Sequence, residues 1–131
     1  MGDKRLEETQ QWQRSDTLVN NIEEAIAFYT EHLGFSMEQN FGPFAIVSRD
    51  DLQIWLSDPR TSAARPMTDG SVPSPGGWNR LVIQVDGLAS LVERLKGQGI
   101  HFRNEIISGV GGKQILAEDP SGNPIELQQP S

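Results

Sequence analysis

At 131 residues the chain is long enough for one ordinary domain, and its 36% hydrophobic and 22% charged residues exclude a disordered or membrane-spanning protein. Its formal net charge of −7 argues against a nucleic-acid or acidic-membrane partner, because such partners require a clustered positive surface. The chain contains no cysteine, which excludes disulfides, a thiolate nucleophile and sulfur-ligated metal.

The first predicted elements follow a polar segment at residues 1–12, which lacks hydrophobic periodicity and is expected to form an arm outside the core. A strand is predicted at 14–19. A helix follows, with Asn21 as its N-cap, apolar residues along one face and Gly34 just after its end. Three further strands are expected at 36–40, 44–49 and 52–57.

The second half of the chain repeats this order of elements. A joint rich in Pro, Gly and Ser lies between Asp58 and Trp78 and is not expected to form regular structure. After it come a predicted strand at 80–85 and a helix that begins near Leu88 and ends at glycines. Strands are then expected at 101–107, 113–118 and 124–128, with turns at 108–112 and 119–123.

The repetition indicates an internal duplication. Val19 corresponds to Val85 and Gly34 to Gly99 at nearly the same offset along the chain. Each unit is too small to bury a good core alone, so the two are expected to share one. The predicted organisation is a single domain with an arm at 1–12, a first module at 13–58, a linker at 59–79 and a second module at 80–129.

Alternation along the predicted strands assigns side chains to the two faces of the sheet. Gln53 and Trp55 are expected on the face opposite the helix, as are Arg80 in the second module's first strand and Glu126 in its last. The residues expected to pack under the helices are Leu52, Ile54, Leu56, Leu81, Ile83, Val85, Ile125 and Leu127. The mixed face is either solvent surface or the lining of a cup, and alternation alone does not distinguish the two.

Two segments carry a resemblance to a known family. The run from Ala25 to Phe35 (AIAFYTEHLGF) and the run from Glu118 to Leu127 (EDPSGNPIEL), in two tandem strand-helix-three-strand units, resemble the vicinal oxygen chelate superfamily. That superfamily includes glyoxalase I, bleomycin-resistance proteins, extradiol dioxygenases and fosfomycin-resistance enzymes. The resemblance spans about residues 14–129.

The resemblance implies an α+β fold, in which two tandem βαβββ modules form a cupped, largely antiparallel eight-stranded sheet (the glyoxalase/bleomycin-resistance fold). It also implies a homodimer, because members of this family commonly build each cup from one half of each of two chains. The length of the linker permits swapped or unswapped pairing.

The resemblance further implies where a metal would bind. Enzymes of this family hold a divalent cation such as Zn, Ni, Mn or Fe with a His or Gln at the start of each module's first strand and a Glu on each last strand. These positions correspond to Arg14, Arg80, Trp55 and Glu126, and only Glu126 matches the pattern. A guanidinium stays protonated and has no lone pair to donate, so no cofactor is expected. The histidines, His32 and His101, fall at other positions and are expected to have surface or edge roles.

Two interpretations of these residues remain open. In the structural one, Arg80 and Glu126 form a bidentate ion pair across neighbouring strands, and Asp16 is a similar partner for Arg14. In the functional one, the arginines and tryptophans line a cup and bind a flat or anionic molecule. The candidate ligand-binding residues are Arg14, Gln53, Trp55, Trp78, Arg80 and Glu126.

Three functions are compatible with the sequence. The first is a metal-independent protein of the bleomycin-resistance kind that binds a small aromatic or anionic molecule. The second is a metal-dependent enzyme that uses Glu126, either a lactoylglutathione lyase-like lyase or a dioxygenase, and the third is a structural dimer without a ligand. The arginines favour binding over catalysis, and no catalytic residue is assigned. The chain shows neither a membrane-spanning apolar run nor a signal peptide at its start, so a cytoplasmic location is expected.

Overall fold

The computed structural model describes residues 14–131, so the predicted polar arm at 1–12 lies outside the described residues. The first module consists of β1 (Ser15–Leu18), α2 (Ile22–His32), β2 (Ser36–Asn40), β3 (Phe44–Arg49) and β4 (Leu52–Ser57). The second consists of β5 (Leu81–Gln84), α3 (Leu88–Gly97), β6 (Ile107–Gly109), β7 (Gly112–Glu118) and β8 (Pro124–Pro130). The linker between them contains one short 3-10 turn, η1 (Ser62–Ala64).

Each module forms its own four-stranded mixed sheet. The strand orders are β1-β4-β3-β2 and β5-β8-β7-β6. In both sheets the first strand pairs in parallel with the last, and the other neighbours pair antiparallel. The α+β class and the two tandem βαβββ modules are therefore confirmed. The eight strands are hydrogen-bonded as two sheets of four, with β1 and β5 at sheet edges.

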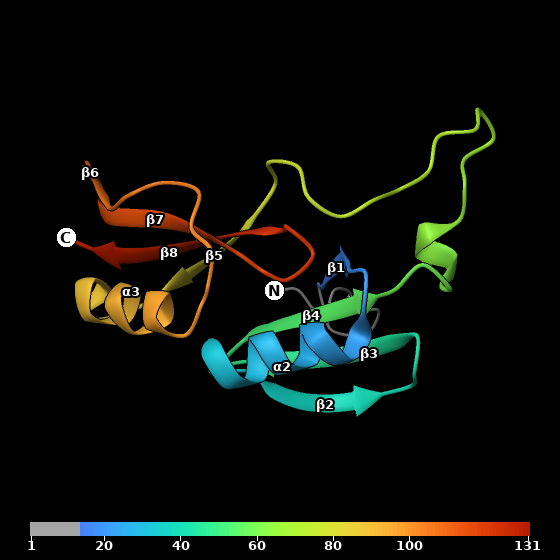
Figure 1. Cartoon of the computed structure of the whole chain (residues 1–131), viewed down its shortest axis with the longest axis horizontal. Helices are drawn as coiled ribbons and strands as arrows, with labels where there is room; N and C mark the ends of the chain where they lie inside the picture. Colours follow the sequence, from blue (N-terminus) through green and yellow to red (C-terminus); the bar gives the residue numbers. More distant parts are fainter. Residues whose placement is uncertain (1–13) are drawn as a thin grey trace, which may run out of the picture.

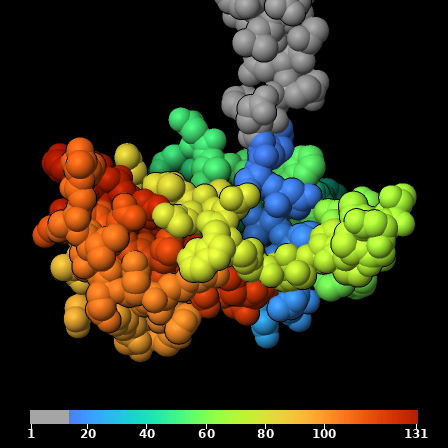
Figure 2. All heavy atoms as spheres, turned by 90° about the horizontal axis from the view of Figure 1, so that it is seen from above, coloured from blue at the N-terminus to red at the C-terminus, as the bar shows by residue number. Residues whose placement is uncertain are grey.

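The two modules lie side by side, and the linker runs along one side of both. In Figure 1, α3 lies below β7 and β8, α2 lies between β4 above it and β2 below it, and the linker arches above both modules. Figure 2 views the molecule from the linker side, and there the linker, coloured from green to yellow, crosses the boundary between the two modules. The linker thus bridges the two modules along one side of the molecule.

The buried face of each sheet follows the predicted alternation. In β4 the buried Ile54 and Leu56 alternate with the half-buried Gln53 and Trp55. One apolar cluster contains residues of both modules, which is how two small units can bury a common core. Its largest fully buried members are Tyr29, Ile54, Leu56, Leu88, Leu95, Ile115, Ile125 and Leu127.

The two helices begin in different ways. The predicted N-cap of α2 is confirmed, since the side chain of Asn21 accepts the Glu24 amide N–H at 2.8 Å. Helix α3 has Gly87 at its N-cap, with a φ of 60° and no side-chain cap. There the Leu88 amide donates to Oε1 of Gln129 on β8, at 2.8 Å. Neither helix in residues 14–131 has the length and apolar character needed to cross a membrane.

The strand predicted at 101–107 is wrong. This segment runs beside β7 but makes only one isolated bridge, between Phe102 and Ala117, before β6 begins at Ile107. The Leu116 amide donates to Oδ1 of Asn104 at 2.9 Å. A side-chain oxygen thus takes the place of a backbone carbonyl, and the regular ladder is interrupted.

Candidate functional site

The two modules meet through the turn that follows β7. The buried carboxylate of Asp119, 4% exposed, accepts a hydrogen bond from the Tyr29 hydroxyl at 2.9 Å. It also accepts the backbone amides of Ser121 and Asn123, each at 2.9 Å. Nδ2 of Asn123 in turn donates to the Leu18 carbonyl at 2.8 Å. These bonds hold β1 of the first module close to the start of β8 in the second.

Tyr29 remains a neutral donor in this contact. Burial raises the pKa of the Tyr29 hydroxyl well above its ordinary value, and the charge and hydrogen bond of Asp119 raise it further. The phenol therefore stays protonated at neutral pH and donates a hydrogen bond to Asp119. These hydrogen bonds from Tyr29, Ser121 and Asn123 compensate for the burial of the Asp119 carboxylate.

A cavity of about 340 Å³ lies at the junction of the two modules. Its volume is within the usual range for small-molecule sites. Arg80 lines it, together with polar side chains of β1 and of the linker. The full lining comprises Ser15, Asp16, Thr17, Leu18, Tyr29, Ser74, Gly76, Asn79, Arg80, Leu81, Asn123, Pro124 and Ile125.

The predicted ion pair between Arg80 and Glu126 is present. Nε of Arg80 donates to Oε1 of Glu126 at 3.1 Å, and the two side chains are 32% and 12% exposed. The hydrogen bond runs through Nε alone, so the pair is not the bidentate one that the sequence suggested. Within residues 14–131 no hydrogen bond uses Nη1 or Nη2 of Arg80. Glu126 thus orients the guanidinium while its terminal donors stay available to an anion.

A second group forms on the first module, on the face opposite α2. Nε of Arg14 and Nε1 of Trp55 both donate to Oε1 of Gln53, the latter at 3.2 Å. The guanidinium carbon of Arg14 lies 5.6 Å from the Trp55 ring centre, and the Phe44 ring meets Trp55 edge-on at 5.2 Å. Asp16, the partner suggested for Arg14, accepts a hydrogen bond from the Ser57 hydroxyl at 2.8 Å.

Trp78, also a predicted ligand-binding residue, lies at the end of the linker. Its ring packs on the guanidinium of Arg103 at 4.8 Å, and 72% of the residue is exposed. Arg103 also donates to Glu118 and to the carbonyls of Gly77 and Gly122. The structure therefore places Trp78 where it fastens the linker to the second module.

The predicted site residues thus form two groups, with Trp78 apart from both. Arg14, Gln53 and Trp55 contact one another, and Arg80 contacts Glu126. No hydrogen bond or ion pair among residues 14–131 links Gln53 or Trp55 to the Arg80–Glu126 pair.

Sequence reasoning did not assign several residues that line the cavity. Asp16 was considered only as a partner for Arg14, although alternation places it on the same strand face as that candidate site residue. The contact between Tyr29 and Asp119 has no local signal, because 90 residues separate the partners.

The residues at the family's metal positions do not fit a divalent cation. Among the described residues no three His, Cys, Asp or Glu side chains come together in a way that could hold a metal ion. Arg14, Arg80 and Trp55 offer no electron pair, and the carboxylate of Glu126 is engaged by Arg80. His32 contacts Oε1 of Gln98 through Nδ1 at 2.9 Å, away from these positions.

Comparisons with known proteins agree with this architecture. The sequence profile of the Glyoxalase/Bleomycin resistance protein/Dioxygenase superfamily matches residues 16–127. No protein among the curated sequences matches the chain.

Similar solved structures include three proteins with different functions. A lactoylglutathione lyase from Agrobacterium tumefaciens has a TM-score of 0.68 and 19% identity, over 92% of this chain and 93% of that one. An antibiotic-binding protein from a Streptomyces species has a TM-score of 0.68 and 23% identity, over 94% and 99%. A fosfomycin resistance protein from Mesorhizobium loti has a TM-score of 0.67 and 12% identity, over 93% of both chains. At these identities the likeness shows the fold alone.

Proposed function

Because the chain belongs to the Glyoxalase/Bleomycin resistance protein/Dioxygenase superfamily, we propose that it binds a small aromatic or anionic molecule without the help of a metal. The ligand occupies the cavity at the module junction, which Arg80 lines, and extends from there onto the sheet faces opposite the helices. The six candidate residues predicted from the sequence remain the proposed contacts, with Arg80 as the main anion-binding group.

One observation carries the proposal. Arg80 lines a cavity of about 340 Å³, and Glu126 holds its guanidinium through Nε. Nη1 and Nη2 have no hydrogen-bond partner in residues 14–131. A guanidinium that is fixed on one edge and open on the other can grip a carboxylate or phosphate with two parallel hydrogen bonds.

The group around Trp55 supports an aromatic ligand. Its indole is half-buried and bordered by Arg14 and Phe44, an arrangement that offers a flat surface beside a positive charge. A similar structure belongs to an antibiotic-binding protein, so the fold is compatible with the binding of a small molecule.

The proposal is tested by titration with a panel of aromatic carboxylates, followed by calorimetry and by tryptophan fluorescence. Replacing Arg80 alone would leave the Glu126 carboxylate without its ion-pair partner. The informative variant is therefore the double substitution Arg80→Gln with Glu126→Gln, which removes both charges together. We expect that variant to lose at least about tenfold in affinity, the usual cost of a charged hydrogen bond.

A matched control is available in the linker. Arg60 also bonds a carboxylate through Nε, that of Asp58, at 3.0 Å, but neither residue lines the cavity at the module junction. The double substitution Arg60→Asn with Asp58→Asn removes the same charges elsewhere and is expected to leave binding unchanged. Equal losses in both double variants would refute a specific role for Arg80.

The alternative, a metal-dependent lyase or dioxygenase that uses Glu126, has a distinct experimental outcome. Near-stoichiometric Zn, Ni, Mn or Fe in protein purified without chelator would contradict the proposal. Activity on a hemithioacetal or a catechol that is abolished both by chelator and by Glu126→Gln would establish the enzyme. If the protein binds nothing in the panel and carries no metal, the third function, a structural dimer without a ligand, is the one that remains.

We also propose that the protein is a homodimer. Phe41, which is 59% exposed, stacks on Phe44, and Phe44 in turn meets Trp55 edge-on. An aromatic row therefore runs from Trp55, a proposed ligand contact, to the protein surface. Exposed apolar rows of this kind are typical of interfaces. Light scattering coupled to size exclusion checks the mass, and a monomer at micromolar concentration would contradict this part of the proposal. The cytoplasmic location stays a prediction from the sequence.

A further inference from the structure

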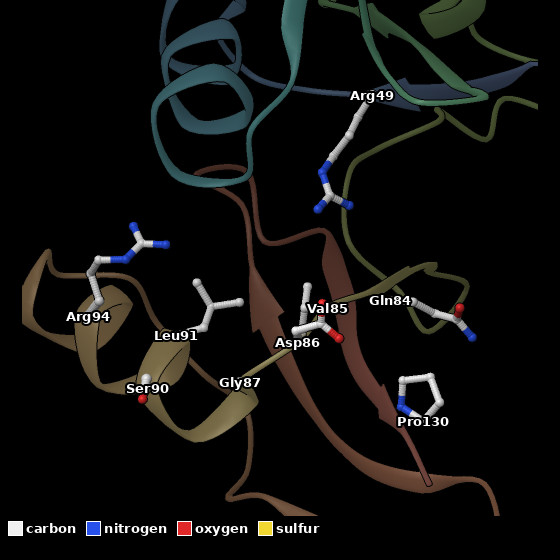
Figure 3. A pocket seen from close by; sticks show the side chains of 9 residues that line it. All are labelled: Arg49, Gln84, Val85, Asp86, Gly87, Ser90, Leu91, Arg94 and Pro130. Carbon is white, nitrogen blue, oxygen red and sulfur yellow. The ribbon is translucent and has the colours of Figure 1, made fainter.

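A second hollow lies between the modules, beside α3. It has a volume of about 710 Å³, and Arg49 at the end of β3 reaches into it from the first module. Figure 3 shows Arg49 on one side and Leu91 and Arg94 of α3 on the other, with Val85 and Asp86 between them. An adjoining cavity of about 180 Å³ shares Arg49, Val85, Leu91 and Arg94. We call this combined space the Arg49 groove.

Two arginines from different modules lack partners in the Arg49 groove. Arg49 is half-buried and Arg94 is exposed. Neither side chain forms a hydrogen bond or ion pair with any residue in the described range 14–131. Asp86, which lines the wider part, comes within 4.0 Å of neither guanidinium. A partly desolvated guanidinium with no counter-charge is a ready site for an anion.

The smaller cavity of the groove has a largely apolar lining beside Arg49, Arg94 and His32. Buried Ile83 and Leu127 and half-buried Val85 and Leu91 line it, and no carboxylate does. A ligand that fits must therefore bring an apolar body to these side chains and a negative group to the arginines.

We propose that the Arg49 groove binds a short carboxylic acid, whose carboxylate bridges Arg49 and Arg94 and whose hydrocarbon part covers the apolar lining. None of the residues that line this groove lines the cavity beside Arg80, so the site is separate from the one in the proposed function. The carboxylate ties one module to the other, because its two arginines belong to different modules.

The charge of the surroundings selects a monoanion. The protein carries a net charge of −7, which repels polyanions as a whole. Asp86 stands at the wider end of the groove and opposes a second negative group there. A ligand with a single carboxylate therefore meets less repulsion from Asp86 than a ligand with two negative groups.

Hexanoate is a suitable probe, and 1-hexanol is its neutral counterpart. In a 15N NMR titration of the full chain at neutral pH, we expect hexanoate to shift the amides of Val85 and Leu91 with about millimolar affinity, as its few atoms allow. Hexanol is expected to bind at least about tenfold more weakly, since it cannot accept charged hydrogen bonds from both arginines. Equal binding of acid and alcohol would overturn the proposal.

Variants locate the binding site. Arg49→Gln and Arg94→Gln are each expected to weaken hexanoate binding about tenfold or more. Arg65→Gln is the matched control, because Arg65 is an exposed linker arginine that lines none of these cavities. An equal loss in Arg65→Gln would show a general effect of net charge and would overturn the proposal.

Two further readouts separate this proposal from the others. Hexanoate shifts confined to the indole N–H of Trp55 would place the acid at the other site and overturn the assignment to the Arg49 groove. A change from dimer to monomer in Arg49→Gln or Arg94→Gln would show that a second copy of the chain fills the groove, which also overturns it. The double variant of Arg80 and Glu126 should bind hexanoate as the unaltered protein does.

Discussion

Replacing Tyr29 with Phe tests how much the contact between the modules contributes to stability. The substitution removes one hydroxyl and keeps the ring, which packs edge-on against Phe28 and Phe35 at 5.0 and 5.5 Å. The lost hydrogen bond to Asp119 is 2.9 Å long and fully buried. A hydrogen bond to a charged group contributes about 1.5–3 kcal/mol, and Asp119 keeps its other donors, so we expect a loss of about 2 kcal/mol.

Urea unfolding followed by circular dichroism measures this loss. With an ordinary dependence on denaturant, about 2 kcal/mol corresponds to a midpoint lower by about 1 M. Thr30→Val is the matched control, because it removes the hydroxyl of the next residue, which bonds only the Ile26 carbonyl within the same helix. We expect that control to change stability by less than about 0.5 kcal/mol. A Tyr29→Phe effect no larger than the control would refute the reasoning.

The pH dependence provides a second check on Tyr29. Burial and Asp119 raise the pKa of its hydroxyl in the folded protein, whereas in the unfolded chain the phenol loses its proton near pH 10. The stabilisation is therefore complete below about pH 10 and is lost as the pH rises from there toward the folded pKa. The stability difference between the protein and Tyr29→Phe should be constant from pH 7 to 9 and shrink above about pH 10. A difference that stays constant at higher pH would contradict the assigned cause.

Three further predictions concern the rest of the fold. Gly112→Ala should destabilise the protein by more than about 3 kcal/mol in thermal unfolding, because φ is 128° and the added carbon would lie 2.0 Å from the Gln129 carbonyl oxygen. Its control is Gly97→Ala in α3, where open space surrounds the added carbon, and that substitution should stabilise the protein by up to about 1 kcal/mol. Asn21→Ala should cost about 1 kcal/mol in urea unfolding through loss of the α2 cap, and an unchanged midpoint would contradict the observed bond. Arg103→Gln should speed proteolysis of the linker severalfold, since its guanidinium bonds both the linker and the second module, and an unchanged cleavage rate would show that other contacts hold the linker.

The agreement between predicted and observed elements is best where the evidence in the sequence is local. The strands at 36–40, 44–49 and 52–57 match β2, β3 and β4 at both ends. Strand alternation and helical spacing are patterns over a few consecutive residues, so they can be recognised without knowing which elements pack against the segment. The segment at 101–107 failed because a side chain 12 residues from Leu116, that of Asn104, replaced a backbone partner there.

The sequence by itself determined the order of the elements, the buried face of β4 and of β5, the cap of α2 and the presence of arginines where the family carries metal ligands. These are properties of residue type and short spacing. Only the tertiary structure decided that Arg80 bonds Glu126 through Nε, that Tyr29 meets Asp119, and that Arg49 and Arg94 face one hollow. The physical reason is that these contacts join residues of different strands or modules, and their geometry depends on how the two sheets come together.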